Sequence, residues 1–217
     1  MRLQHIALSV LLAASAAAAD GATVSDLRLG FYGMGTSGSS DYELTNTTTG
    51  ALVSSSTETW DADSHGRFSV SYVGGEAKPV GMIFGIGAAI DVAEYEWANG
   101  DSQSWTGFII DLNLGLAVAL DEKIHFEAAG VFGFGSGMVD YEVAGFDIDP
   151  ADAAIVELGL RFGAYGTFSG LQVGIETGWM ATYYLGAEWE VVGMNRTLTE
   201  DTEFSGAFIG LTIGARL

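Results

Sequence analysis

The feature that most constrains this chain is a strict alternation of side-chain type between Phe108 and Leu120. Every second position is large and apolar, whereas the positions between hold Ile109, Asp111, Asn113 and small residues. A repeat of two is the period of a β-strand, whose side chains point alternately to its two faces. At ~3.3 Å per residue the apolar row is about 40 Å long, and a ~45° tilt reduces its height to about 28 Å. That height is close to the ~25 Å apolar band of a strand that crosses a membrane.

The same alternation recurs in seven more segments, which are residues 27–32, 67–72, 82–92, 124–134, 156–163, 171–179 and 209–217. Three connections are tight, near residues 74–79, 121–123 and 169–170. The others are longer or more polar, near residues 35–58, 99–103, 144–153 and 187–202. Short turns on one side and long loops on the other are typical of membrane barrels. We therefore predict an all-β fold, an eight-stranded antiparallel up-and-down transmembrane β-barrel.

A soluble eight-stranded barrel is the alternative to a membrane barrel. Its outer face would carry Lys, Glu and other long polar side chains. In this chain the face opposite the apolar rows holds mostly Gly, Ala and Ser, and 31 residues are glycine. The chain is 48% hydrophobic with a net charge of -20, yet it has only 8 Lys and Arg residues. Small inward residues suit a narrow lumen and large outward ones suit lipid, so the pattern favours the membrane barrel.

The N-terminus indicates export. Residues 1–19 begin with Met1-Arg2, continue as an apolar run and end in Ala17-Ala18-Ala19 before Asp20. This is the layout of a cleaved signal peptide, and the run is shorter than the ~20 apolar residues of a membrane helix. Residues 20–217 are then one barrel domain, expected in the bacterial outer membrane. Cysteine is absent, which excludes disulfides and thiolate chemistry.

At this point the chain resembles the small outer-membrane β-barrels of the outer-membrane protein A and X type. The resemblance covers the whole mature chain and rests on the strand pattern and the loop layout. The last segment, GAFIGLTIGARL, ends in alternating apolar residues, although it closes on Leu217 where the family usually has Phe. Only the barrel is represented, without a peptidoglycan-binding domain. The resemblance implies delivery by the barrel assembly machinery and contact with outer-membrane lipid and lipopolysaccharide.

Charged residues recur on the inward face of the predicted strands. In a barrel of this size the interior is just filled by side chains, and buried charges persist when they are paired. We therefore predict a lumen charge network that plugs the barrel, with a gated ion path as the alternative. Its members are Arg28, Arg67, Asp111, Glu127, Glu157, Arg161 and Glu176.

Tryptophans lie toward the loop-side ends of the predicted strands. Trp and Tyr favour the membrane interface because an apolar ring carries a polar group that needs a wet partner. We therefore expect Trp97, Trp105 and Trp179 at the interface. For Trp60 and Trp189, packing within the loops is an equal alternative.

The predicted loops are strongly acidic. Clusters of carboxylates suit Ca²⁺ or Mg²⁺, and the stretch from Asp61 to His65 offers several candidate ligands. No loop has the spacing of an EF-hand, so we expect a solvated acidic rim, with no metal site and no cofactor. The same charge argues against nucleic-acid binding, which needs a basic surface.

Enzymes of small barrels use a histidine with a serine and a carboxylate. The mature chain offers His65 and His125. Strand parity directs His125 into the lumen with Glu127, and His65 lies near Ser64 and Asp63 only in sequence. We therefore expect a monomeric, non-enzymatic outer-membrane protein, structural or binding an extracellular ligand through its acidic loops. A narrow porin-like channel or, less favoured, a lipid A-modifying enzyme are the alternatives.

Overall fold

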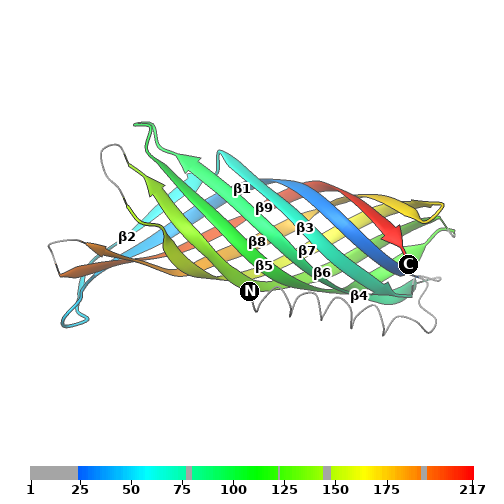
Figure 1. Ribbon diagram of the computed structural model, residues 1–217, viewed down its shortest axis with the longest axis horizontal. Helices are drawn as coiled ribbons and strands as arrows, with labels where there is room; N and C mark the ends of the chain where they lie inside the picture. The colour runs from blue at the N-terminus through cyan, green and yellow to red at the C-terminus, as the bar shows by residue number, and fades with distance from the viewer. Residues whose placement is uncertain (1–23, 77–79, 122, 144–147, 192–194) are drawn as a thin grey trace.

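The computed structural model describes residues 24–76, 80–121, 123–143, 148–191 and 195–217. The predicted signal peptide, residues 1–19, lies outside them. Within the described residues, no helix is long and apolar enough to cross a membrane. They form nine strands (Figure 1): β1 (Val24–Asn46), β2 (Leu52–Asp61), β3 (Ser64–Gly75), β4 (Val80–Glu96), β5 (Ser102–Ala119), β6 (Ile124–Glu142), β7 (Ala151–Phe168), β8 (Leu171–Val191) and β9 (Arg196–Arg216).

The antiparallel sheet closes on itself. From β3 to β9 each strand pairs with its neighbour in sequence, and β1 pairs with both β3 and β9. The closing ladder runs from Asp26 opposite Arg216 to Asn46 opposite Arg196. Eight strands therefore form the ring, as the alternation predicts. The ninth, β2, pairs with β1 between Ser37 and Thr45. This segment of β1 lies beyond Gly33, where the pairing of β1 with β3 stops.

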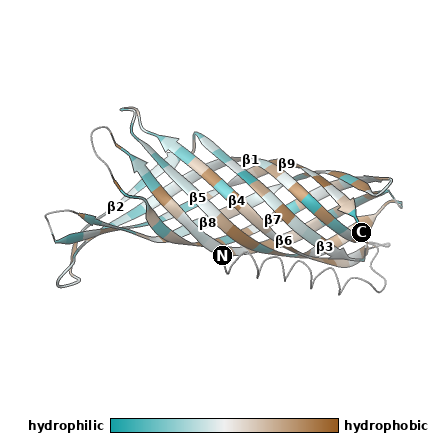
Figure 2. Cartoon of the chain, viewed as in Figure 1, coloured by the Kyte–Doolittle hydropathy of each residue, from teal (hydrophilic) through white to brown (hydrophobic). Residues whose placement is uncertain are grey.

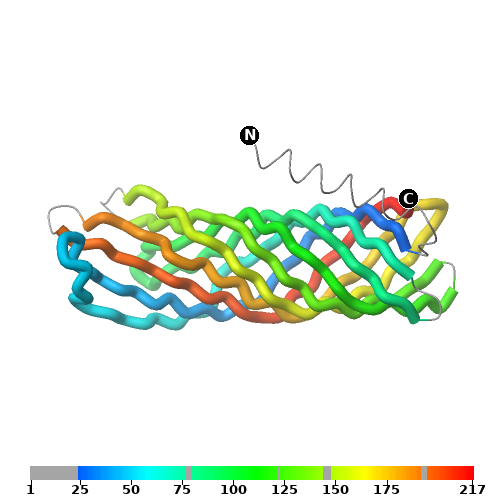
Figure 3. Tube along the Cα trace, turned by 90° about the horizontal axis from the view of Figure 1, so that it is seen from below, coloured from blue at the N-terminus to red at the C-terminus, as the bar shows by residue number. Residues whose placement is uncertain are grey.

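The two ends of the ring differ. At the turn end, β7 and β8 are joined by Ser169 and Gly170, which have φ angles of 52° and 85°. Two positive φ values are characteristic of the tight hairpin turns that follow strand twist. The turn after β5 is held by Asp121, whose carboxylate accepts the N–H groups of Lys123 and Ile124 and therefore has a lowered pKa. The opposite end, called the loop end, carries the β1–β2 hairpin (Figures 1 and 3).

Two of the predicted loops are wrong in extent. Most of residues 35–58 lies in the β1–β2 hairpin, and residues 187–202 largely continue β8 and β9. These Ser- and Thr-rich segments accept the β conformation, since Thr is β-branched and the neighbouring strand satisfies their backbone groups. The hairpin bends at Asn46, whose side chain accepts the N–H groups of Thr48 and Thr49. The paired strands β1–β2 and β8–β9 therefore extend the wall of the ring beyond the apolar rows.

Hydrophobic and polar residues alternate along the strands (Figure 2), and the large apolar side chains of the central part are exposed on the outside of the ring. On β5, Leu112, Leu114 and Leu116 are exposed, whereas Ile109, Asp111 and Asn113 at the alternate positions face inward and are buried. Large apolar side chains are thus left open to the surroundings on one face of a closed sheet.

Tyr72 keeps its predicted place in the outer row, where it lies opposite Leu27 of β1 and its ring centre lies 6.4 Å from that of Phe84. It is buried, and its hydroxyl lies 3.3 Å from Ser25 Oγ on β1. The neighbouring Gly74 leaves room for the ring, because a Cβ there would lie 2.9 Å from the Tyr72 hydroxyl.

Close approach of two strands makes Gly115 sensitive to substitution. A Cβ at Gly115 would lie 2.1 Å from the carbonyl oxygen of Ala128, on β6. Backbone cannot move aside as a side chain does, so Gly115→Ala should lower the free energy of unfolding by about 1–3 kcal/mol. At Gly130, the nearest atom would be the Leu114 carbonyl oxygen at 3.9 Å, and Gly130→Ala should be nearly neutral. Urea midpoints of the two variants check this, and equal midpoints would contradict the strand spacing.

Candidate functional site

The first layer of the interior, nearest the turn end, is built around Arg28 on β1. Its Nη1 and Nη2 donate to the two carboxylate oxygens of Glu127 on β6, at 2.8 and 2.6 Å. Nη2 also lies 3.0 Å from Asp26, and Nε donates to Gln172 at 2.8 Å. The guanidinium lies 4.0 Å from the centre of the Tyr165 ring. A buried, bidentate and stacked arginine of this kind holds four strands in one geometry.

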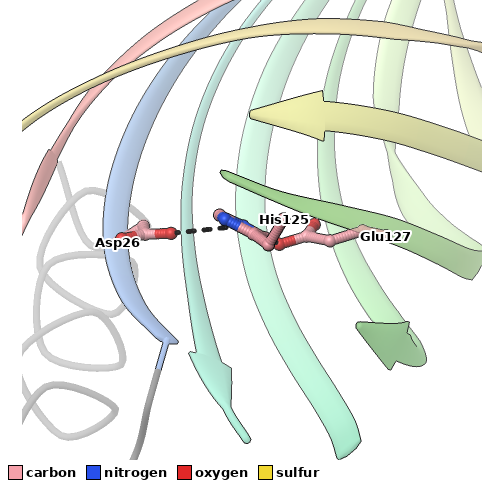
Figure 4. Close-up of side chains that lie close together, drawn as sticks. All are labelled: Asp26, His125 and Glu127. Carbon is pink, nitrogen blue, oxygen red and sulfur yellow. Dashed lines mark hydrogen bonds and ion pairs between the residues drawn. The ribbon is translucent and has the colours of Figure 1, made fainter. Parts of the chain in front are cut away.

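Asp26, His125 and Glu127 converge in the same layer (Figure 4), and their oxygen and nitrogen atoms lie within 4.8 Å of one another. Spacing alone would suit a divalent cation. However, Arg28 Nη2 donates to the same Asp26 oxygen and to the same Glu127 oxygen that face His125. The guanidinium therefore already pairs with both carboxylates, and a metal would have to displace it. The donor set fits an arginine better than a metal.

The second layer pairs Arg161 on β7 with two acids. Its Nη2 lies 3.6 Å from Glu127, and its Nη1 lies 3.7 Å from Glu176 on β8. Glu176 accepts the hydroxyls of Tyr32 at 2.8 Å and Tyr165 at 2.6 Å. The carboxylate is thus held by direct hydrogen bonds from tyrosines and by a longer ion pair with the arginine.

The third layer is built around Arg67 on β3. Its Nη1 donates to Glu157 on β7, and its Nη2 lies 3.3 Å from Asp111 on β5. Thr182 donates to the same Glu157 oxygen at 3.3 Å. One arginine therefore bridges acids from strands that are not neighbours in the sheet.

All seven residues predicted for the charge network are buried inside the ring. The structure distributes them over three layers, one for each arginine. Sequence reasoning missed Asp26, Asp91 and Gln172, which are also buried inside. Strand parity is the signal that could have found them, since Asp26 lies two residues before Arg28 and Asp91 two before Ala93 on the inward face.

His65 does not meet the residues that are its neighbours in sequence. Its Nε2 lies 3.0 Å from Asp91 Oδ2 on β4, and its Nδ1 lies 2.9 Å from Thr36 Oγ1 on β1. With Asp91 accepting from Nε2–H, Nδ1 accepts the threonine hydroxyl. Thr36, His65 and Asp91 have the donor order of a hydrolytic triad, and all three are buried.

A fourth layer, of aromatic rings, lies toward the loop end. Trp105 stacks on Trp60 with ring centres 4.8 Å apart, and Phe204 packs edge-on against both. Tyr184 joins the cluster through Phe204. Trp60, Trp105 and Phe204 come from β2, β5 and β9, so this aromatic layer links distant parts of the wall.

The prediction of Trp105 as an interfacial residue is wrong, because Trp105 is fully buried in the aromatic layer. Its odd number on β5 places it on the inward face with Ile109 and Asp111, and parity prevails over the general preference of tryptophan for interfaces. Trp179 is exposed on the outside. Trp97 follows β4 at the loop end, where its Nε1 lies 3.3 Å from Glu58. For Trp60 the sequence left the interface and packing within a loop as equal alternatives, and the structure packs its ring inside, in the aromatic layer.

The acidic stretch 61–65 is not gathered into a ligand set. Asp63 accepts the backbone N–H of Glu96 at 2.7 Å and is exposed, whereas His65 is buried. A buried carboxylate does occur at the loop end: Glu200 accepts from Gln103 at 2.8 and 3.0 Å and from Tyr141 at 2.7 Å. Neutral donors rather than a cation satisfy this acid.

Comparison with known proteins adds little to this geometry. No family model matches the chain, and no curated protein matches it. Among solved structures, it is similar to the outer membrane protease OmpT from Escherichia coli, with 8% identity over 89% of this chain and 98% of that chain, at a TM-score of 0.47. It is also similar to the attachment invasion locus protein Ail of Yersinia pestis, with 10% identity over 86% and 99%, at a TM-score of 0.32. A FadL homologue of Pseudomonas aeruginosa follows with 5% identity over 89% and 90%, at a TM-score of 0.22.

Proposed function

We propose that this chain is a non-enzymatic protein of the bacterial outer membrane, with a closed, side-chain-filled lumen and a binding surface at its acidic loop end. The proposal includes an eight-stranded transmembrane barrel of the outer-membrane protein A and X type, acting as a monomer. Its surroundings would be outer-membrane lipid and lipopolysaccharide, reached through the barrel assembly machinery.

Placement in a membrane is supported by the two faces of the ring. Large apolar side chains such as Phe84, Leu114 and Phe162 are exposed on the outside. Three arginines, Arg28, Arg67 and Arg161, are buried within. In water this arrangement would expose apolar surface around the whole ring. In lipid it is favourable, since a closed sheet leaves no unpaired strand edge.

The observation that carries the proposal is the filling of the interior. Three ion-pair layers and the aromatic layer follow one another along the axis, and each joins side chains from at least three strands. The two histidines of the described chain are both held by buried acids. Such an interior leaves no wide water path for a porin and no open nucleophile for an acyl-transfer enzyme.

Binding at the loop end is supported by its charge. The segments 37–63, 94–104, 139–152 and 182–205 contain many Asp and Glu residues and one basic residue, Arg196. Here the strands extend beyond the apolar rows as a polar wall. A surface of this charge attracts a cationic partner and repels anions.

Planar-bilayer recordings test the closed lumen. The wild-type protein should give no steady conductance, because the three ion-pair layers and the aromatic layer fill the lumen. The double variant Trp60→Ala with Trp105→Ala removes two stacked rings but leaves the three ion-pair layers, so it should stay silent as well, like Trp179→Ala on the outside. A steady wild-type current would favour a channel. An altered lipid A mass spectrum in cells that produce the protein would favour an enzyme instead.

A further inference from the structure

A cavity of about 30 Å³ lies between the second and third layers of the interior. Arg161 and Glu176 line it from one side, and Arg67 and Asp111 line it from the other. Ser69, Ser71 and Asn113 add polar groups to its wall, and Met34, Met180, Val131 and Phe208 add apolar ones. The two ion-pair layers are therefore separated by a small space of mixed polarity.

Arg161 carries an unsatisfied donor at this cavity. Its Nε makes no hydrogen bond with any described residue, and the side chain is buried. Its ion pairs with Glu127 and Glu176 are long, at 3.6 and 3.7 Å. Arg28, by contrast, bonds directly to its acids at 2.6–3.0 Å. A buried guanidinium N–H without an acceptor is unfavourable, so the arrangement favours a bound acceptor beside Arg161.

We propose that the cavity is a water site, in which bound water accepts from Arg161 and links the Arg161–Glu176 pair to the Arg67–Asp111 pair. A buried water needs about 10–15 Å³ and two to four polar partners, so the cavity holds about two molecules. Apolar cavities stay dry, but the hydroxyls of Ser69 and Ser71 and the amide of Asn113 make this one polar.

The barrier in the lumen would then consist of packed side chains with a small hydrated cavity between the Arg161 and Arg67 layers. Bound water also screens the acids that share Arg67 and Arg161, which lowers the cost of burying them. The inference goes beyond the proposed function, because it requires neither a loop ligand nor a particular membrane.

Hydroxyl-radical labelling in ¹⁸O-enriched water tests the water site. X-ray radiolysis of bound water generates radicals in place, and a methionine beside that water gains labelled oxygen. Met180 lies on the cavity wall and is only 6% exposed, so bulk water hardly reaches it. The matched control is Ile155→Met, which puts a thioether in the aromatic layer at a position 2% exposed. Met180 should be labelled several-fold faster than the methionine introduced in place of Ile155.

A filling variant gives the second arm. Ser71→Leu replaces a polar wall with a larger apolar one and should abolish most of the Met180 labelling, whereas Ser54→Leu on the exposed β2 should leave it unchanged. If Ser71→Leu does not fold, the wild-type NMR spectrum provides the test instead. Bound water should then give a cross-peak to the Met180 methyl group. Equal labelling of Met180 and of the introduced methionine, or the absence of that cross-peak, would overturn the proposal. Bilayer conductance tests the closed lumen separately, so the water-site proposal and the proposed function can fail independently.

Discussion

Replacing Arg28 with methionine should lower the free energy of unfolding by about 3–5 kcal/mol, the cost of leaving one side of a buried ion pair without its partner. Arg28 is 1% exposed and bonds directly to Glu127, Asp26 and Gln172. Without it, Glu127 retains Arg161 at 3.6 Å and Asp26 retains Arg216 at 3.1 Å. Methionine fills similar space, so lost packing contributes little.

The measurement is the urea midpoint of the refolded protein, with two comparisons. Arg161→Met should shift it less, because the ion pairs of Arg161 are longer than those of Arg28. Asp149→Asn at the loop end should leave it unchanged, since Asp149 is exposed and such charges are screened within ~8 Å at physiological salt. A midpoint for Arg28→Met equal to that of Asp149→Asn would show that the first layer contributes nothing to stability.

The second large effect is expected on the outer face. Leu114 is 62% exposed in the centre of the apolar belt on β5. Leu114→Arg would place a charge in the middle of the bilayer and should destabilise the membrane-inserted protein by about 2–4 kcal/mol. In water, an exposed arginine at the same place would cost almost nothing.

Folding into lipid vesicles checks this difference. The fraction folded at increasing urea should fall for Leu114→Arg and stay at the wild-type value for Ser56→Arg, which adds the same charge to the exposed hairpin strand β2. If the two variants have the same midpoint, the apolar belt does not face lipid and the proposed membrane placement is wrong.

Strand positions were largely predictable from sequence because alternation is a local property. The inward or outward direction of Asp111, Leu114 and Glu127 follows from counting residues along one strand. Counting also places Trp105 inside. Its prediction as an interfacial residue was wrong because the general preference of tryptophan for interfaces was given more weight than strand parity. The extent of β1 and of the β1–β2 hairpin was not predictable, since polar Ser and Thr runs are compatible with both loop and strand.

The partners across the lumen could not be read from sequence. Whether Arg28 meets Glu127 or Glu157 depends on the tilt and stagger of eight strands, which are fixed only when β1 closes onto β9. The same closure brings His65 to Thr36 and Asp91 instead of Ser64, and stacks Trp60 of the hairpin on Trp105. The sequence by itself therefore determined which side chains face inward, because a strand's period is set by its covalent geometry. Only the tertiary structure decided which of them touch, because that depends on the register between strands far apart in the chain.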